Sequence, residues 1–523
     1  MESLDDAYMH ADIAIIGGGS VGVSFLCQLI KCLVPQTAHP GPFPQILLFE
    51  PACSPGSGEA YGGDLNTNLL NIPVRGMTAF ADDKAHFQRW LQAQPPSLLS
   101  RFGVHQFDDD SFLPRPLFGY YMERVYENSL QEAASKGISL HHVRNRVDAL
   151  EKDVNGRWAI SCPGGRYAAK RVVLCNGNLP SAAFPELEEH AGYFNDPYPV
   201  SQLTRRIEPD ASVAILGSSL SAIDAIVALK EAGHQGLIQC FSRNGRLPSV
   251  RSPLNRRHLE PKLTAQGIRQ AAQAHGGRLT LKEFFSLLAA QMNALGEEMD
   301  VADMLGPQLP AREALSREIA AAQAHERLWQ VVSAASNEVI DFAWHLLPQT
   351  ERREYHERWR SLWMARRATF PMQNARNLQR YFEDGALEVL SGYQSCAYSA
   401  EARAFTLRAH SAQTAQTRAY RADYVINATS FCLDATRAKD SLIQQLLRHG
   451  YAAADPFGGL RLDYETGCLL DAQGATQPTI SLLGSLAVGT YFWTISMDVN
   501  ARLAQGQAQR IAGELAQELQ AIR

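Results

Sequence analysis

The sequence lacks a long uninterrupted apolar segment and a large excess of either charge. Its 523 residues carry 49 Lys and Arg against 54 Asp and Glu, a formal net charge of −5. This mild acidity gives no electrostatic footprint for nucleic acid or for an anionic membrane. The first apolar stretch, residues 13–34, is broken by three consecutive glycines, and the first eleven residues have no signal-peptide pattern. We expect a cytoplasmic protein that binds neither nucleic acid nor membrane.

Catalytic and metal-binding side-chain patterns are also scarce. The nine cysteines are scattered, with no CxxC pair, which predicts neither a disulfide framework, nor a zinc site, nor a redox disulfide. His141 and His142 would face opposite sides of a strand, so a shared metal is not expected. There is no G-x-S-x-G elbow, and Glu351 and Glu354 lie in a charged helical pattern. No general acid–base pair stands out, so the catalytic residues remain unknown and the chemistry would come from a cofactor.

A dinucleotide-binding motif stands near the N-terminus. Residues 12–30 read as buried strand, tight turn and helix, and GGGSVG within them fits G-x-G-x-x-G. Gly17 permits the turn, Gly19 lets the backbone approach a pyrophosphate, and Gly22 lets helix and strand pack closely. The helix start, with Ser20 and Val21, offers N–H groups to phosphates. The alternative is a glycine-rich loop without a ligand.

The residues after this motif support the ligand-binding reading. The next apolar run, QILLFEP at residues 45–51, reads as a second strand, and Glu50 stands at its end, where an acid can accept hydrogen bonds from ribose hydroxyls. Its spacing from the glycines is longer than the usual ~20 residues, and the loop at 34–44 accounts for the excess. A strand, a turn, a helix and an acid in this order favour a nucleotide site over a bare loop.

A second, weaker motif lies in mid-chain. Residues 212–233 again read as strand, turn and helix, and GSSLSAID keeps Gly217 but has Ser219 and Ala222 where the later glycines would be. The alternative is a helix capped by Ser218 or Ser219. The next strand ends in Phe241-Ser242-Arg243, without the acid expected for NAD. An arginine there suits the 2′-phosphate of NADP, so we favour NADPH.

The two motifs open two copies of one coarse pattern. Each copy runs through strand, turn, helix, second strand, excursion, β-rich stretch and a final strand, ending at Asn176-Gly177 and at residues 427–430. We predict an α/β fold with two Rossmann-like dinucleotide-binding domains and a helical insertion. The expected parts are a discontinuous first domain (1–195 and 431–523), an inserted second domain (196–250 and 371–430) and an insertion (251–370).

These features resemble a known superfamily. GGGSVG with Glu50, GSSLSAID, VVLCNGN, VINATS and LLGSLAVGTYFWT together resemble flavoproteins with two dinucleotide-binding domains. EPACSPGSGEAYG, LLNIPVRGM and FLPRPLFGYYM look like a group of bacterial FAD/NAD(P)-binding oxidoreductases, distantly similar to N-hydroxylating class B flavin monooxygenases. The resemblance implies FAD in the first domain and NADPH in the second.

The resemblance also implies flavin-side residues. The loops that carry Asn71, Arg75 and Arg115 would line the flavin ring. The alternative is that Asn71 merely caps a turn and Arg115 pairs with an acid on the surface. In the tail, Gly484 and Thr494 precede a final helix whose N-terminus would point toward the pyrimidine edge of the flavin. Val147 is a further candidate cofactor contact.

The expected function follows from two nucleotide sites without acid–base machinery. We expect an FAD-dependent, NADPH-oxidising monooxygenase that uses O2 on a small molecule, with N-hydroxylation of an amine or amino acid as the candidate reaction. Two alternatives stay open: an NADPH dehydrogenase that reduces a quinone or another acceptor, and a non-catalytic nucleotide-binding partner protein. The insertion at 251–370 is a candidate substrate lid or dimer surface, and a homo-oligomer is left open.

Overall fold

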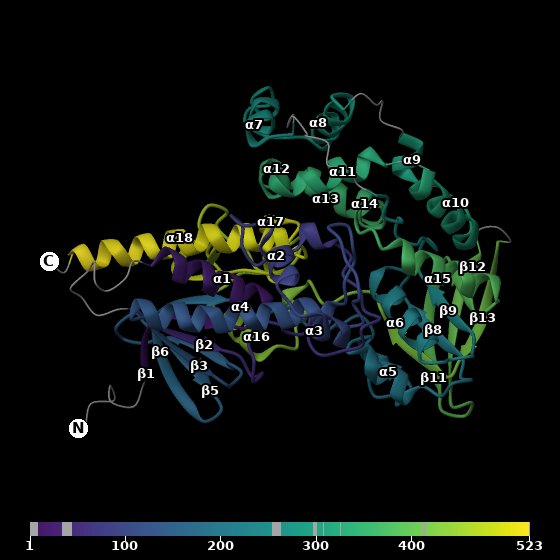
Figure 1. Cartoon of the computed structure of the whole chain (residues 1–523), viewed down its shortest axis with the longest axis horizontal. Helices are drawn as coiled ribbons and strands as arrows, with labels where there is room; N and C mark the ends of the chain where they lie inside the picture. The colour runs from purple at the N-terminus through teal and green to yellow at the C-terminus, as the bar shows by residue number, and fades with distance from the viewer. Residues whose placement is uncertain are drawn as a thin grey trace.

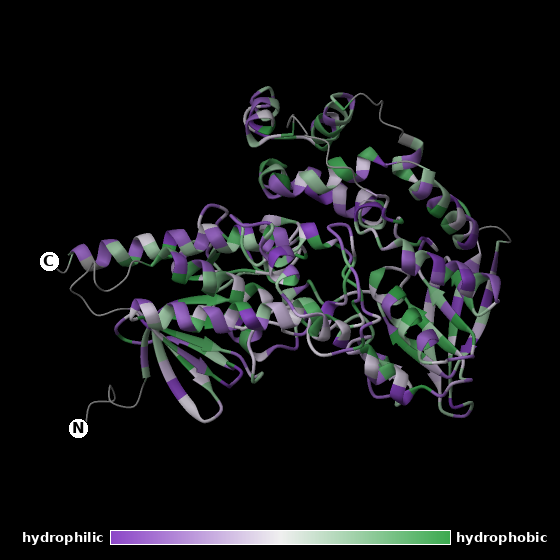
Figure 2. Ribbon diagram, viewed as in Figure 1, coloured by the Kyte–Doolittle hydropathy of each residue, from purple (hydrophilic) through white to green (hydrophobic). Residues whose placement is uncertain are grey.

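The computed structural model describes residues 9–33, 44–253, 263–295, 301–306, 308–324, 326–411 and 415–521. Figure 1 shows an elongated molecule with an α/β body at each end and a layer of helices above them. The N-terminal strand and the C-terminal helix belong to the same body, so the chain leaves this body, builds the second one and returns. In both bodies the strands are mostly hydrophobic, and the helices around them carry both hydrophobic and hydrophilic residues (Figure 2).

The first body is built on an eight-stranded mixed sheet. Its main path runs β15-β16-β6-β1-β2-β3, and all of these pairs are parallel except β15 with β16. Its strands are β1 (Met9–Ile16), β2 (Gln45–Phe49), β3 (Ser139–Val143), β4 (Ala149–Lys152), β5 (Trp158–Cys162), β6 (Gly165–Leu174), β15 (Cys468–Leu470) and β16 (Thr476–Leu482).

Helices cover both faces of this sheet. The N-terminal helix α1 packs along the C-terminal helix α18, and one apolar cluster joins them to α4. A second cluster fills the other face beneath α16. The helices of this body are α1 (Ser20–Cys32), α2 (His86–Gln92), α3 (Pro96–Arg101), α4 (Arg115–Lys136), α16 (Ser441–Arg448), α17 (Val488–Tyr491) and α18 (Met497–Ala521). Helix α4 has Pro116 in its first turn, where a proline is well tolerated.

The second body repeats the first on a smaller scale. A five-stranded parallel sheet runs β10-β9-β8-β14-β7, and an antiparallel three-stranded sheet, β11-β12-β13, packs beside it. The strands are β7 (Tyr193–Phe194), β8 (Val213–Leu216), β9 (Ile238–Phe241), β10 (Leu387–Leu390), β11 (Tyr393–Ser399), β12 (Ala404–Ser411), β13 (Gln416–Ala422) and β14 (Tyr424–Asn427). Helices α5 (Val200–Arg206), α6 (Leu220–Glu231) and α15 (Met372–Glu383) pack on the parallel sheet.

The helical insertion leaves the second body after β9 and returns before β10. Its helices are α7 (Ala265–Gln273), α8 (Leu281–Asn293), α9 (Val301–Leu305), α10 (Ala311–Ala324), α11 (Leu328–Ala335), α12 (Ile340–Leu346), α13 (Gln349–Glu354) and α14 (Arg360–Arg367). Helix α10 packs on the core of the second body, whereas α7, α8, α11 and α12 form their own apolar cluster with Trp493 and Val499. The predicted fold class, α/β with two Rossmann-like units and a helical insertion, is confirmed.

An interior ion pair joins the two bodies. Arg115, at the start of α4, donates from Nη2 to Asp224 Oδ2 on α6 at 2.7 Å, and from Nη1 to Tyr198 Oη at 3.1 Å. The Asp224 side chain is only 5% exposed. Burial lowers the pKa of Arg115, but the neighbouring Asp224 carboxylate raises it further, so the guanidinium stays charged. The pair therefore links α4 of the first body to α6 of the second.

Removing one partner tests this tie. We expect Asp224→Ala to lower the free energy of unfolding by about 3 kcal/mol, because it leaves the Arg115 charge buried without a counter-ion. Urea unfolding at neutral pH measures the change. The matched control is Arg380→Ala, which removes an exposed ion pair with Glu231 at 3.8 Å and should cost less than about 1 kcal/mol. Equal losses in the two variants would contradict an interdomain role.

Candidate nucleotide-binding sites

The first glycine turn is forced into a shape that only glycine adopts. Gly17 follows β1 with φ +102°, and a Cβ there would lie 2.1 Å from the carbonyl oxygen of Cys175 at the end of β6. A Cβ at Gly22 would lie 2.0 Å from the carbonyl oxygen of Gly17. Helix α1 thus starts directly against two parallel strand ends, as the motif predicts. No side chain caps this start at Gly19, so its N–H groups are available to a phosphate.

The mid-chain turn has the same geometry. Gly217 has φ +115°, and a Cβ there would lie 2.6 Å from the carbonyl oxygen of Ala428, after β14. Gly217 N–H donates to Phe241 O at 2.8 Å, as Gly17 N–H donates to Phe49 O at 2.9 Å. The strand register is also the same. In the second sheet Leu216 pairs with Phe241 and Asn427, as Ile16 pairs with Phe49 and Leu174 in the first. The two turns are therefore equivalent in space.

The serine alternative for the mid-chain motif does not hold. Ser219 occupies the N-cap position of α6 but makes no side-chain cap hydrogen bond. Ser218 Oγ instead donates to the Arg246 carbonyl at 2.6 Å and contacts Ser242 Oγ at 3.0 Å. The first turn of α6 is therefore uncapped by side chains, like that of α1, and fits a phosphate.

The residue after the second strand distinguishes the two turns. Glu50 Oε2 accepts a hydrogen bond from Gly18 N–H at 2.9 Å, so the acid is held beside the first turn. Register places Ser242 at the equivalent position of the second unit, followed by the exposed Arg243. Among the described residues no ion pair engages Arg243. The first turn therefore presents a carboxylate, and the second presents a hydroxyl and an uncompensated cation.

Backbone from distant segments closes over the first turn. The loop after β2 returns across it: Gly56 N–H donates to the Gly18 carbonyl at 2.7 Å, and a Cβ at Gly58 would lie 3.0 Å from Gly19 Cα. The tail contributes Gly484, whose absent Cβ would lie 3.9 Å from Val21. Ser485 Oγ also donates to the Gly177 carbonyl at 2.6 Å. The turn thus lies among loop, strand-end and tail backbone.

Unpartnered polar atoms gather where the last helix begins. Thr494 Oγ1, Ser496 Oγ and Asn500 Oδ1 are buried and have no hydrogen-bond partner among the described residues. Thr494 and Ser496 are each 2% exposed. Buried polar groups are nearly always satisfied, so three at one helix start fit a polar ligand such as a flavin edge. Asn176 Oδ1, after β6, is another unpartnered buried atom.

The remaining predicted residues are placed less simply. Asn71 is partly buried and precedes a 3-10 turn, Val74–Gly76, in which Arg75 pairs with Asp110. The guanidinium of Arg115 is engaged by Asp224, by Tyr198 and by the Leu69 carbonyl. Val147 is 3% exposed and packs in the apolar cluster beneath α16. Asn500 belongs to the unpartnered group but carries no sequence signal, because an asparagine inside a helix is ordinary.

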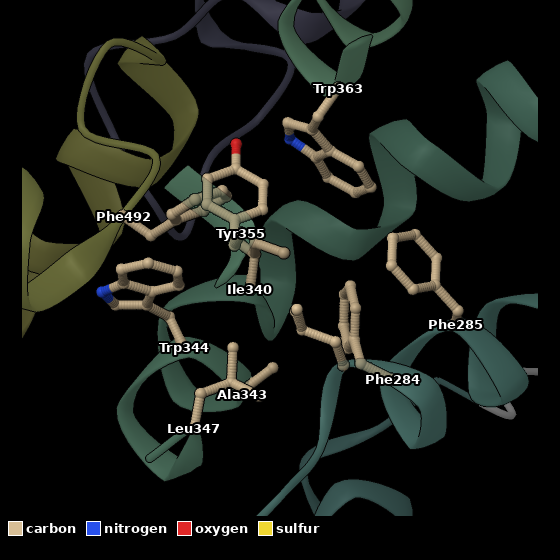
Figure 3. A pocket seen from close by; sticks show the side chains of 10 residues that line it. Phe284, Phe285, Ile340, Ala343, Trp344, Leu347, Tyr355, Trp363 and Phe492 are labelled. Carbon is tan, nitrogen blue, oxygen red and sulfur yellow. The ribbon is translucent and has the colours of Figure 1, made fainter. Parts of the chain in front are cut away.

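The helical insertion packs against the tail through aromatic side chains. Figure 3 shows Phe284, Trp344, Tyr355 and Trp363 of the insertion converging with Phe492 of the tail around a cavity of about 30 Å³. Trp344 Nε1 donates to the Gly489 carbonyl at 2.8 Å. The cavity is apolar and has room for only one or two waters. We call this contact between the insertion and the tail the aromatic seam. It holds the insertion onto the first body, and its cavity is too small for a substrate.

Comparison with known proteins agrees with this geometry. Residues 14–179 match the family model described as FAD-NAD(P)-binding. The uncharacterised protein YdhS from Escherichia coli (strain K12) is 26% identical over 222 residues, which cover 42% of this chain. The match spans only 39% of that relative, about two fifths of its length.

Three solved structures share the fold over almost the whole chain. L-lysine 6-monooxygenase from Pseudomonas syringae is 15% identical, with 96% of this chain and 99% of that one covered and a TM-score of 0.58. The FAD-bound cadaverine monooxygenase from Erwinia amylovora is 13% identical, covering 97% and 95%, with a TM-score of 0.57. Ornithine N-hydroxylase from Kutzneria sp. 744, solved with reduced FAD and NADP+, is 14% identical, covering 97% and 100%, with a TM-score of 0.51.

These findings confirm the resemblance that the sequence motifs indicate. The chain has an FAD-NAD(P)-binding domain in its first body and the two-domain fold of N-hydroxylating flavin monooxygenases. The family model is described as FAD-NAD(P)-binding, and the Kutzneria enzyme holds FAD and NADP+ in the same fold. In the described part of the chain, no cluster of three or more His, Cys, Asp or Glu is suited to hold a metal ion. Within the same residues no helix is both long and apolar enough to cross a membrane.

A methyl group at Gly17 tests the first turn. We expect Gly17→Ala to weaken FAD binding by more than tenfold, because a Cβ at this position collides with the Cys175 carbonyl and pushes α1 off the strand ends. The measurement is the ratio of FAD to protein after purification, followed by titration of the apoprotein. Gly63→Ala is the matched control, since a Cβ there meets no atom within 4 Å. Full FAD occupancy in Gly17→Ala would refute the assignment.

Proposed function

We propose that the protein is an FAD-dependent, NADPH-oxidising monooxygenase that acts on a small molecule, with N-hydroxylation of an amine or amino acid as the reaction. The observation that carries the proposal is the pair of equivalent turns, each followed by a helix start without a side-chain cap. Two such turns suit two dinucleotides. The type of reaction comes from the amine-hydroxylating enzymes whose fold this chain shares.

The first body would hold FAD. The N–H groups of Ser20 and Val21 at the start of α1 would bind the pyrophosphate, and the Glu50 carboxylate would accept hydrogen bonds from ribose hydroxyls. Ser485, next to Gly484, fixes the tail to Gly177 by donating to its carbonyl, and Asn176 offers a buried amide oxygen. At the far end, the hydroxyls of Thr494 and Ser496 and the start of α18 would meet the polar edge of the flavin.

The second body would hold NADPH. Gly217 and Ser219 form the turn, and the first N–H groups of α6 would bind the pyrophosphate. Ser218 braces the loop that carries Arg243 by donating to the Arg246 carbonyl. Arg243 would then bind the 2′-phosphate of NADPH, whereas the Glu50 carboxylate beside the first turn would repel such a phosphate.

The protein residues orient the cofactors and exclude water. Bound FAD would supply hydride acceptance from NADPH and reaction with O2. At the two turns, the described residues offer backbone N–H groups, hydroxyls and the Arg243 guanidinium. The aromatic side chains of the insertion cover the tail on one side and keep water from it. Because the bound cofactors would supply the chemistry, the protein needs no general acid–base pair of its own.

Product analysis tests the reaction. We expect yellow protein with a flavin spectrum, NADPH consumption that rises with a suitable primary amine, and a product one oxygen atom heavier by mass spectrometry. A colourless protein that takes up no FAD on reconstitution contradicts the flavin assignment. NADPH oxidation that reduces a quinone, with no oxygenated product from any amine, indicates an NADPH dehydrogenase instead.

Coenzyme preference tests the second turn. We expect Arg243→Gln to raise the KM for NADPH by about tenfold or more and to leave the KM for NADH unchanged, because only NADPH carries the phosphate that a guanidinium binds. Steady-state oxidation of both coenzymes measures the two constants. Arg246→Gln is the neighbouring control and should change either KM by less than twofold. An equal rise for both coenzymes would point to general damage rather than phosphate recognition.

A further inference from the structure

Two guanidinium groups, that of the partly buried Arg251 and that of the buried Arg367, have no carboxylate beside them among the described residues. Arg251, ten residues after β9, has a buried Nε with no partner, and no ion pair among the described residues involves its side chain. Arg367, at the end of α14, is 9% exposed, and its donors reach only neutral oxygens of Ser333, Ser336 and Asn337. Burying a charge without a counter-ion is costly, so this pair needs an explanation.

Several other arginines in the described interior are neutralised. Arg327 lies between Asp303 and Glu318, Arg115 pairs with Asp224, and Arg502 pairs with Asp341. Arg251 and Arg367 differ from these three because no carboxylate of the described residues pairs with them.

The backbone around Arg251 shows which way its side chain faces. Val250 forms a parallel bridge with Phe370, and both side chains enter the core of the second body. Because side chains alternate along extended chain, Ser249, Arg251 and Thr369 face away from that core. Ser249 Oγ and Thr369 Oγ1 are buried, at 0% and 2% residue exposure, and have no hydrogen-bond partner among the described residues. Three unsatisfied polar groups thus share one face of the bridge.

Positive charge accumulates at this face. Burial, and then the charge of Arg75 on the first body, lowers the pKa of Arg251 to about 10. Burial likewise lowers the pKa of Arg367 to about 9, and the charge of Arg251 adds to the effect. Both guanidinium groups remain protonated at pH 7. Arg75 is already paired with Asp110, so two positive charges remain without a protein counter-ion.

The face also borders the tail segment assigned to the flavin. The Arg367 guanidinium lies over the Trp493 ring, 4.5 Å from its centroid, and Trp493 directly precedes Thr494. Arg75 belongs to the loop of the first body that follows Asn71. Ser249, Arg251 and Thr369 therefore lie where the first body, the second body and the insertion meet.

We propose that Ser249, Arg251 and Thr369 form a binding site for an anionic group, a carboxylate or a phosphate, with Arg367 as the second positive charge beside it. A guanidinium and two hydroxyls are the donors that such an anion accepts. The group belongs to the substrate, a step that rests on the proposed function, whereas the anion site itself does not. The substrate class is then an amine that also carries a carboxylate or phosphate.

Pairs of amines with and without the anion test the site. The FAD-loaded protein is heated with lysine or cadaverine, with ornithine or putrescine, and with O-phosphoethanolamine or ethanolamine. Acetate and inorganic phosphate serve as minimal probes. We expect the member of at least one pair that carries the anion to raise the melting temperature by several degrees, and its partner without the anion to leave it unchanged. The pair that responds distinguishes a carboxylate from a phosphate. No shift with any anionic compound would overturn the proposal.

Arg251→Met separates recognition from a structural role. Without added anion we expect this variant to melt at the same or a higher temperature, because it removes an unpaired buried charge. Its affinity for the anionic probe should fall more than tenfold, and Arg251→Lys should restore part of it. Arg353→Gln, an exposed arginine of α13, is the matched control and should bind like the wild type. A lower melting temperature together with unchanged anion affinity would overturn the site.

Kinetics complete the test. In Arg251→Met the KM for the anionic substrate should rise while the KM for NADPH stays unchanged. A rise in the NADPH constant alone would assign the cluster to the coenzyme and overturn the substrate reading. If the protein proves not to be a monooxygenase, the melting experiments still report on the anion site, so the two proposals fail separately.

Discussion

The arrangement depends on one close contact that occurs twice, a glycine packed on the carbonyl of a neighbouring strand end. At Gly17 and at Gly217 the backbone turns with positive φ while touching Cys175 and Ala428, respectively. No side chain fits between turn and carbonyl, so each helix begins directly over two parallel strands. The N–H groups at the helix start then face the edge where strands end, which is where nucleotides bind in open parallel sheets. Loss of this contact would move the helix and the ligand site together.

The sequence predicts the parts of the fold that depend on local pattern. The strand–turn–helix at 12–30 and its repeat at 212–233 carry their own glycines, and the structure builds both. Contacts between residues far apart in the chain leave no such trace. Arg115 sits in a proline- and glycine-flanked segment that suggested a flavin-lining loop, yet its partner Asp224 is 109 residues away on α6. Nor does any pattern show that Ser249 and Thr369 share a face, because the bridge that aligns them joins positions separated by the whole insertion.

Buried charged and polar groups of the described interior fall into two kinds, those with partners and those without. Structural charges come in satisfied groups, as where Arg327 and Arg366 share Glu318, and their hydrogen bonds offset much of the cost of desolvation. The unsatisfied atoms of Thr494, Ser496, Ser249 and Thr369 have no such partners. Those of Ser249 and Thr369 face the junction between the bodies, and those of Thr494 and Ser496 lie where α18 begins. Each such group costs free energy while it has no partner, and a ligand bound at these two places would supply the missing hydrogen bonds.

The position of the long excursions explains why the junction lies there. In both copies the chain leaves the sheet after the second strand and returns before the third, through residues 50–138 in the first body and 242–386 in the second. Parallel strands end at the same edge, so each excursion emerges over its own nucleotide turn. The first contributes the loop that closes over Gly19 and carries Arg75. The second contributes Arg243, then Arg251, and finally the helices that meet the tail at Trp344 and Phe492. The two excursions leave equivalent points of a repeated fold and meet each other. The side chains that they bring together, such as Arg75 and Arg251, therefore belong to neither domain alone.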